Sequence, residues 1–209
     1  DQPSPNKINT FLSAGRDITR ATSFLIRHQE KFQLNPDKII LAGSSAGAEA
    51  VLHAAYWPRT YADDTTQILE NDFNYAGVIS MAGALTDLGL VNENSAIPTQ
   101  FFHGTCDRLV PYGSAPHHYC AVEDPGYLQL YGPKAIAEKL ARLGKGYYMV
   151  TECYGGHEWA SKPLKENIQD ITEFIYHDIL NNKTRQIHKI IKSDQKTCPK
   201  LNHYSFCGD

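Results

Sequence analysis

The segment Gly43–Gly47, GSSAG, most constrains the fold, because it stands between a short apolar run and a helical pattern. The run KIILA before it is too short and too apolar for a half-exposed strand, so we expect a central strand of a parallel sheet. The stretch AEAVLHAAYW after it predicts a helix from about Ala46 to Tyr56. Glycines and serines at this junction predict a sharp turn from strand to helix.

The same alternation continues along the chain. Further buried strands are expected from Tyr75, from Thr99 and from Gly146. Helices are expected over about residues 17–32 and 133–143, and after Pro163. Strands that alternate with helices predict an α/β fold, a mostly parallel sheet with helices on both faces.

Length and composition favour one folded core with an appendage. The chain has 209 residues, 42% of them hydrophobic, and a net charge of -3 that argues against a general nucleic-acid binder. No stretch approaches the roughly 20 apolar residues of a membrane span. We expect a core over residues 1–180. Residues 181–209, with six Lys or Arg against two Asp, are expected to form a basic appendage.

The five cysteines give no metal-binding pattern, since none of them forms a C-x-x-C pair. Cys198 and Cys207 bracket a short polar loop, which predicts a disulfide staple and slightly favours a secreted or periplasmic protein. Five reduced thiols in a cytosolic protein are the alternative. The pairing of the others, Cys106, Cys120 and Cys153, stays open.

The turn places Ser45 at its tip, where a strained backbone would expose the hydroxyl at the carboxyl edge of the sheet. Gly43 and Gly47 fill the flanking positions, which must be small because the chain segments approach closely there. The backbone N–H of Ala46 would point toward a developing oxyanion at the helix N-terminus. Ser44 lies within the turn and has no special role in this interpretation. A plain small-residue turn is the alternative.

A serine needs a base, and His157 is the best candidate among nine histidines. It follows the fourth strand and a glycine pair, at the same sheet edge as Ser45. His103 lies within a strand and is expected to be packed, and His53 is expected to pair with Glu49 on a helix face. His117 and His118 are expected in a surface loop.

The base in turn needs an acid that holds its tautomer, and Asp107 is the best candidate. It follows the third strand, next to the strand that leads to His157. Asp87, after the second strand, is the competitor, and Glu123 and Asp124 lie further out in a loop. The order Ser, Asp, His along the chain is the one expected for this architecture.

These segments together resemble the α/β-hydrolase superfamily, in particular its esterase and carboxylesterase-like members. AGSSAGAEA resembles the nucleophile motif, FFHGTCDRLVPY the acid loop and GGHEW the histidine loop, within a resemblance that covers roughly residues 15–180. It implies a Ser45, His157, Asp107 triad that forms an acyl-enzyme on a small-molecule carboxylic ester. It implies no metal and no cofactor.

One departure from the family concerns the N-terminal part of the fold. Such enzymes carry further strands and an HGGG-like loop, with a second oxyanion donor, before the nucleophile. No HGG precedes Ser45 in this sequence. We therefore expect a sheet that is incomplete at its N-terminal side, and a missing or separate N-terminal segment of the same fold.

Two other functions stay open. A serine peptidase of the same superfamily would carry the same motifs, and a non-catalytic binding or scaffold module would explain the late start. The tyrosine-rich insertion between Val110 and Gly132 is expected either to line an acyl or sugar site or to pack on itself.

Overall fold

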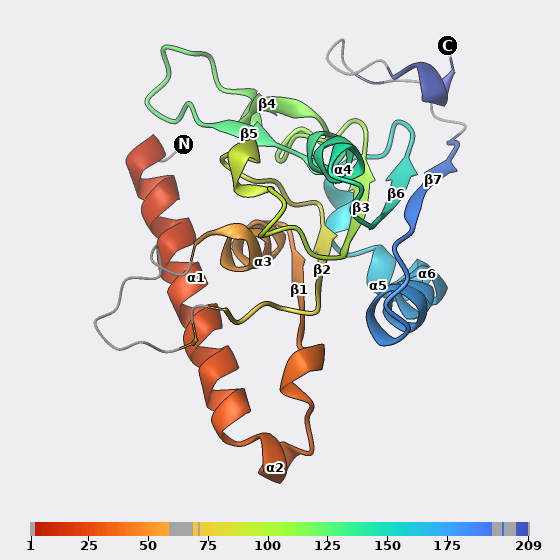
Figure 1. The fold of residues 1–209 in the computed structure, drawn as a ribbon. Coiled ribbons are helices and arrows are strands. Elements are labelled where there is room, and N and C mark those ends of the chain that lie inside the picture. Colours follow the sequence, from red (N-terminus) through yellow and green to blue (C-terminus); the bar gives the residue numbers. More distant parts are fainter. Residues whose placement is uncertain (1–2, 59–68, 71, 194–197, 199–203, 209) are drawn as a thin grey trace.

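A five-stranded parallel sheet forms the centre of the molecule (Figure 1). The computed structural model describes residues 3–58, 69–70, 72–193, 198 and 204–208. The strand order is β1-β2-β3-β6-β7, and every neighbouring pair is parallel. The strands are β1 (Ile40–Ser44), β2 (Gly77–Met81), β3 (Thr99–Gly104), β6 (Tyr147–Glu152) and β7 (Gln186–Ile191).

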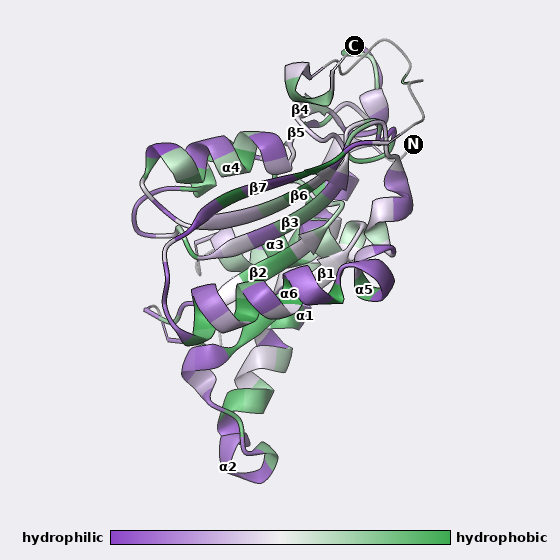
Figure 2. Ribbon diagram, turned by 90° about the vertical axis from the view of Figure 1, so that its right-hand side faces the viewer, coloured by the Kyte–Doolittle hydropathy of each residue, from purple (hydrophilic) through white to green (hydrophobic). Residues whose placement is uncertain are grey.

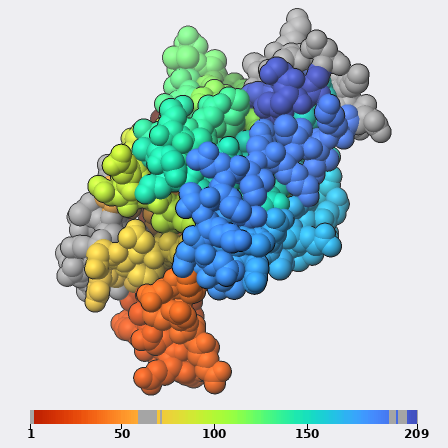
Figure 3. Space-filling view, turned by 45° about the vertical axis from the view of Figure 1, so that its right-hand side comes forward, coloured from red at the N-terminus to blue at the C-terminus, as the bar shows by residue number. Residues whose placement is uncertain are grey.

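Helices cover both faces of this sheet (Figure 1). On one face lie α3 (Ala46–Tyr56) and α4 (Pro133–Arg142), and the long α1 (Ser4–Arg27) packs on α3. On the other face lies α6 (Ile168–Phe174), which follows the short α5 (Pro163–Glu166) and continues as a π-helix over Ile175–Leu180. The short α2 (Gln29–Phe32) follows α1 and projects from the body of the molecule (Figure 3).

Shorter elements connect these layers. A small antiparallel pair joins β4 (Ser114–Pro116) and β5 (Gln129–Tyr131) within the tyrosine-rich insertion. Single turns of 3₁₀-helix occur at Pro36–Lys38, Leu88–Leu90, His117–Tyr119, His157–Ala160 and Ser205–Cys207.

Alternation along each strand creates two separate apolar cores. Val78, Phe101 and Met149 point to the face that carries α3 and α4. Their chain neighbours Ile79, Phe102 and Val150 point to the opposite face, where Phe174 and Ile179 cover them. Figure 2 shows green, hydrophobic segments within the sheet among paler and purple ones, and purple, hydrophilic segments on α4 and α6. Strands buried on both faces explain the continuous apolar runs in the sequence.

The predicted fold class is confirmed, and two details of the sheet differ from expectation. β1 was expected to be central, but within the described residues it is an edge strand, with Leu41 half-buried and Ala42 exposed. The expected appendage contributes β7, which pairs with β6 over six residues. Its mixed sequence QIHKII lacks the strong apolar run of the central strands, because all six of its residues are exposed or only half-buried.

The first helix is also longer than the apolar spacing predicted, since it begins at Ser4 rather than near Asp17. Phe11 is buried and stacks on the ring of His53 of α3, at 4.6 Å between ring centroids. Gly15 lies against the ring of Trp57. Glycine is a poor helix former, so Gly15 weakens the helical pattern, and the sequence did not predict the N-terminal half of this helix.

No helix among the described residues is both long enough and apolar enough to span a bilayer.

Candidate active site

Ser45 sits at the tip of a strained turn between β1 and α3. Its backbone dihedrals are φ 53° and ψ -124°, a conformation that residues other than glycine rarely adopt. Its N–H donates to the carbonyl of Met81 at 2.9 Å, and its own carbonyl accepts from Ala48 and Glu49 in the first turn of α3. Such backbone strain costs on the order of 1–3 kcal/mol and persists only where the surroundings impose it.

Gly43 allows this turn, and Gly47 is not needed for it in the way we expected. A Cβ atom on Gly43 would lie 2.2 Å from the carbonyl oxygen of Gly47, so the two backbones meet with no space for a side chain. A Cβ atom on Gly47 would meet nothing within 4 Å. The expectation of close approach is therefore correct for position 43 and wrong for position 47.

The three residues singled out from the sequence form one chain of hydrogen bonds. Ser45 Oγ lies 2.8 Å from His157 Nε2, and His157 Nδ1 lies 2.8 Å from Asp107 Oδ2. Since Nδ1 faces a carboxylate, it carries the proton, and Nε2 is left to accept the serine hydroxyl. Ser45 follows β1, Asp107 follows β3 and His157 follows β6, so the carboxyl ends of three parallel strands bring them together.

The carboxylate of Asp107 is buried yet charged. Its Oδ1 accepts the N–H groups of Leu109 and Val110 at 2.8 and 3.0 Å. Its Oδ2 accepts from His157 and also lies 3.2 Å from Nε2 of His103. Burial alone would raise the pKa of Asp107, but the hydrogen bonds from His103 and His157 hold that pKa well below its usual range.

His157 is correspondingly basic. The hydrogen bond to Asp107 raises the pKa of His157 above its ordinary value, against a smaller opposing effect of burial. The ring stands on the 3₁₀ turn His157–Ala160, which Trp159 anchors in the core. The indole N–H of Trp159 donates to Glu152 at the end of β6, so the turn is tied back to the strand that precedes it.

The acid loop and the histidine loop are bonded directly to each other. Cys106 N donates to the carbonyl of Gly155 at 2.8 Å, and Tyr154 N donates to Thr105 Oγ1 at 2.8 Å. A Cβ atom on Gly104 would lie 2.2 Å from the same Gly155 carbonyl. The two loops are therefore in close backbone contact, and this contact fixes the spacing of Asp107 and His157.

Ser44 has a structural role that sequence reasoning missed. Its hydroxyl donates to the carbonyl of Ala160, at the end of the turn that carries His157. The residue before Ser45 thus ties the serine turn to the histidine turn. No short sequence pattern predicts this bond, because its two partners lie 116 residues apart in the chain.

The N–H of Ala46 has no acceptor within α3, since Ala46 is the first helical residue. It is the group expected to face an oxyanion beside Ser45. Within the part of the chain that the structure describes, no cluster of three His, Cys, Asp or Glu side chains is placed to bind a metal ion.

The competing histidines have structural partners. His53 is buried between the carbonyl of Glu49 and the hydroxyl of Thr86, and burial lowers the pKa of His53 to about 4. The expected side-chain pair with Glu49 is thus a bond to its backbone. His103 is packed as expected, and its Nε2 lies 3.0 Å from the carbonyl of Val110 and 3.2 Å from Asp107 Oδ2, so one N–H is shared between the two acceptors.

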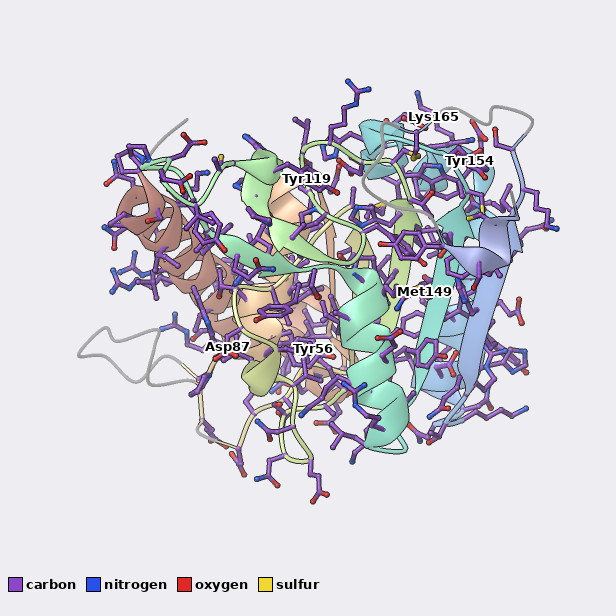
Figure 4. All side chains as sticks on the ribbon, turned by 90° about the horizontal axis from the view of Figure 1, so that it is seen from above. Tyr56, Asp87, Tyr119, Met149, Tyr154 and Lys165 are labelled. Carbon is purple, nitrogen blue, oxygen red and sulfur yellow. A yellow bond between two sulfur atoms is a disulfide. The ribbon has the colours of Figure 1, made fainter. Side chains whose placement is uncertain are left out.

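The competing acids serve their own turns. Asp87 accepts from Gly89 N at 2.7 Å, and Asp124 accepts from Ala121 N at 2.8 Å. Figure 4 shows Asp87 near Tyr56, on the opposite side of the view from Tyr154 of the histidine loop. Tyr112 of the insertion is buried in the core rather than lining a site.

Glu49 is a second buried carboxyl group beside the site. It lies one helical turn after Ser45, is 3% exposed, and its Oε1 lies 3.7 Å from His117 Nε2. Burial raises the pKa of Glu49 to about 8, although the nearby charges of His157 and Lys7 oppose this effect. Burial likewise lowers the pKa of His117 to about 4. Both groups are therefore largely neutral at pH 7.

Comparison with known proteins relates part of the chain to a known family. Residues 6–96 match the family model BD-FAE, an esterase domain of the α/β-hydrolase type. This match includes the turn at Ser45 and ends before Asp107 and His157. The match covers less than half of the chain, and this part of the chain is therefore similar to an esterase domain of the α/β-hydrolase type.

Two solved structures are similar to this chain. Esterase PE8 is 20% identical with a TM-score of 0.47, over 74% of this chain and 58% of its own. MGS-M1, an α/β hydrolase from a Medee basin deep-sea metagenome library, is 19% identical with a TM-score of 0.48, over 79% and 64%. The chain thus spans less than two thirds of the length of either structure. No curated protein matches the sequence.

The two glycines of the serine turn should respond differently to a methyl group. We expect Gly43→Ala to destabilise the protein by about 1–3 kcal/mol or more, because its Cβ would overlap the Gly47 carbonyl. Gly47→Ala, the matched control, should be neutral or stabilising by about 0.5–1 kcal/mol, since it adds a better helix former in open space. Denaturant unfolding of both variants checks this, and equal effects would contradict the assignment of close approach to position 43.

Glu49 should make stability depend on pH. The pKa of Glu49 in the folded state, about 8, lies above its value in the unfolded chain, near 4.5. The stabilisation that the protonated carboxyl gives the fold is therefore fully present below pH 4.5 and is lost as pH rises through about 8. We expect the unfolding free energy of the wild type relative to Glu49→Gln to fall by on the order of 4 kcal/mol between pH 5 and 9. Glu30→Gln, at an exposed position of α2, is the control. A difference that is flat with pH would contradict the buried, neutral carboxyl.

Proposed function

We propose that this chain carries the catalytic groups of a serine hydrolase that cleaves carboxylic esters of small molecules. The observation that carries the proposal is the hydrogen-bond chain from Ser45 through His157 to Asp107, with 2.8 Å at each step. The strained backbone of Ser45 supports it, because such strain is concentrated at functional sites.

In the proposed first step, Ser45 Oγ attacks the ester carbonyl carbon while Nε2 of His157 takes the hydroxyl proton. The imidazolium that forms is stabilised by the charged carboxylate of Asp107, which stays deprotonated throughout. The low pKa of Asp107 and the raised pKa of His157 both favour this distribution of charge.

The tetrahedral intermediate places a negative charge on the former carbonyl oxygen. The N–H of Ala46 is the donor that we propose for this oxyanion, helped by the positive N-terminal end of α3. His157 then gives its proton to the leaving alcohol, and an acyl group remains on Ser45. A water molecule, deprotonated by His157, releases the acid and restores the enzyme.

A further proposal concerns the free edge of β1. Within the described residues this edge has no partner strand, yet Ile40 and Leu41 are apolar and only half-buried. An edge of this kind is usually paired or covered. We propose that an N-terminal segment of the same fold, in the same protein or in a separate chain, adds a strand to β1.

Covalent labelling tests the nucleophile. We expect a fluorophosphonate probe to add once to the protein, as seen by intact mass, and the adduct to be absent in Ser45→Ala. Ser44→Ala is the matched control, since it keeps the nucleophile and should still be labelled, more slowly, after losing its bond to Ala160. An adduct that survives Ser45→Ala would contradict the proposed nucleophile.

Paired substrates then separate the functions. An activated ester cleaved far faster than a matched peptide amide supports the esterase, whereas comparable rates favour a serine peptidase of the same superfamily. Absence of labelling and of both activities favours the binding or scaffold module.

The role of Asp107 can be tested by the pH dependence of the labelling rate. The base must be unprotonated to act, so labelling should rise with pH through an apparent pKa above 6.5, the ordinary imidazole value. Asp107→Asn should move this inflection down and lower the rate by roughly 10⁴-fold, because it removes the bond that raises the pKa of His157. Asp87→Asn, the competing aspartate, should leave both the rate and the inflection unchanged.

A further inference from the structure

Two disulfides begin next to the proposed acid and base. Cys106, which pairs with Cys198, is the residue immediately before Asp107. Cys153, which pairs with Cys207, directly follows β6 and lies four residues before His157. The predicted staple between Cys198 and Cys207 is therefore wrong, since each of these cysteines reaches back to a different loop of the site. Cys120 belongs to neither disulfide.

The chain end that receives the second disulfide is packed against the core. We call residues 204–208 the C-terminal hook. Tyr204 and Phe206 of the hook lie against Tyr112, with ring centroids 4.9 and 6.4 Å away. Tyr112 is fully buried and donates to or accepts from Thr151 of β6 at 2.8 Å. Figure 3 shows the hook, in dark blue, seated against the body of the molecule.

The hook also bonds directly to the histidine loop. Tyr154 OH donates to the carbonyl of Gly208 at 2.7 Å, and Figure 4 shows Tyr154 beside the hook. Tyr154 is held at φ 65°, in the left-handed region. A strained residue, a buried disulfide at Cys153 and a hydrogen bond to the hook thus occur within five residues of the base.

We propose that the two disulfides are positioning elements of the active site, which hold the acid loop and the histidine loop against the C-terminal hook so that Asp107 and His157 stay in hydrogen-bond contact. This inference rests on the proposed function, because it gives the disulfides a role in the same site. It deepens that function, since it makes residues far beyond the last helix part of the catalytic arrangement.

The physical argument is one of tethering. The two loops already share the bonds between Cys106 and Gly155 and between Thr105 and Tyr154. Both loops nevertheless leave the sheet at its edge, where the disulfides add covalent links to these bonds. The disulfides close separations of 92 and 54 residues, so each of them ties a loop of the site covalently to a distant part of the chain. Losing them should loosen the loops without unfolding the sheet.

Reduction supplies a reversible test. A dithiol such as dithiothreitol donates two electrons to each disulfide, so one protein disulfide becomes two thiols and the dithiol becomes its cyclic disulfide. Complete reduction is verified by the mass added on alkylation. Spectra of the backbone amides before and after reduction verify that the sheet is still folded.

The readout is the titration of the His157 ring by NMR, assigned with His157→Gln. In the oxidised protein the bond to Asp107 raises the pKa of His157. After reduction we expect this pKa to fall toward its ordinary value near 6.5, and fluorophosphonate labelling to slow by about 10- to 100-fold. Reoxidation should restore both. A disulfide that only stabilises the fold would change the melting temperature and leave the pKa of His157 in place.

Paired variants guard against poor reduction of the buried Cys153. Cys153→Ala with Cys207→Ala, and separately Cys106→Ala with Cys198→Ala, should each lower the pKa of His157, and Cys120→Ser is the matched control. If a pair fails to fold, the reduced wild type still decides the question.

An unchanged pKa and an unchanged labelling rate in the reduced, folded protein would overturn the inference while leaving the hydrolase proposal intact. If the oxidised protein is not labelled at all, the proposed function fails. The His157 titration then still reports whether the disulfides hold the Asp107 contact.

Discussion

The close approach of two backbones at Gly43 and Gly47 is the constraint on which the rest of the site depends. It forces the chain to turn from β1 into α3 within one residue, and the strain falls on Ser45. The bond from Ser45 N to Met81 of the neighbouring strand keeps the turn in place. Because the sheet holds the turn in place, the position of the Ser45 hydroxyl is set by the pairing of the strands and not by a flexible loop.

Two buried carboxyl groups near this turn show how the surroundings decide charge. Asp107 receives two backbone N–H groups and two imidazoles, and its pKa is held low. Glu49 is also buried, but its Oε1 lies 3.7 Å from His117 and accepts no hydrogen bond, and burial raises the pKa of Glu49 to about 8. Burial opposes ionisation in both, and only hydrogen bonds overcome it. Two carboxyl groups of the same site therefore differ in charge at pH 7: Asp107 is ionised and Glu49 is largely neutral.

The sequence predicts those parts of the molecule whose information is local. The apolar runs predict four of the five strands described in the main sheet, and the small-residue turn predicts Ser45 at its tip, because strand period and turn chemistry depend on adjacent residues. β7 was missed because an edge strand needs no continuous apolar run. The N-terminal half of α1 was missed because Gly15, which allows Trp57 to pack closely, weakens the helical pattern.

The remaining features depend on contacts between distant residues, which a single sequence does not encode in any short pattern. The bond from Ser44 to Ala160 and the two disulfides are of this kind. Proximity in sequence suggested that Cys198 would pair with Cys207, yet the fold brings each beside a different loop at the carboxyl ends of β3 and β6. Strand order sets this outcome: β3 and β6 are neighbours, so the acid loop, the histidine loop and the C-terminal hook meet at one edge. The parallel sheet that assembles Ser45, His157 and Asp107 therefore also selects the cysteines that pair around them.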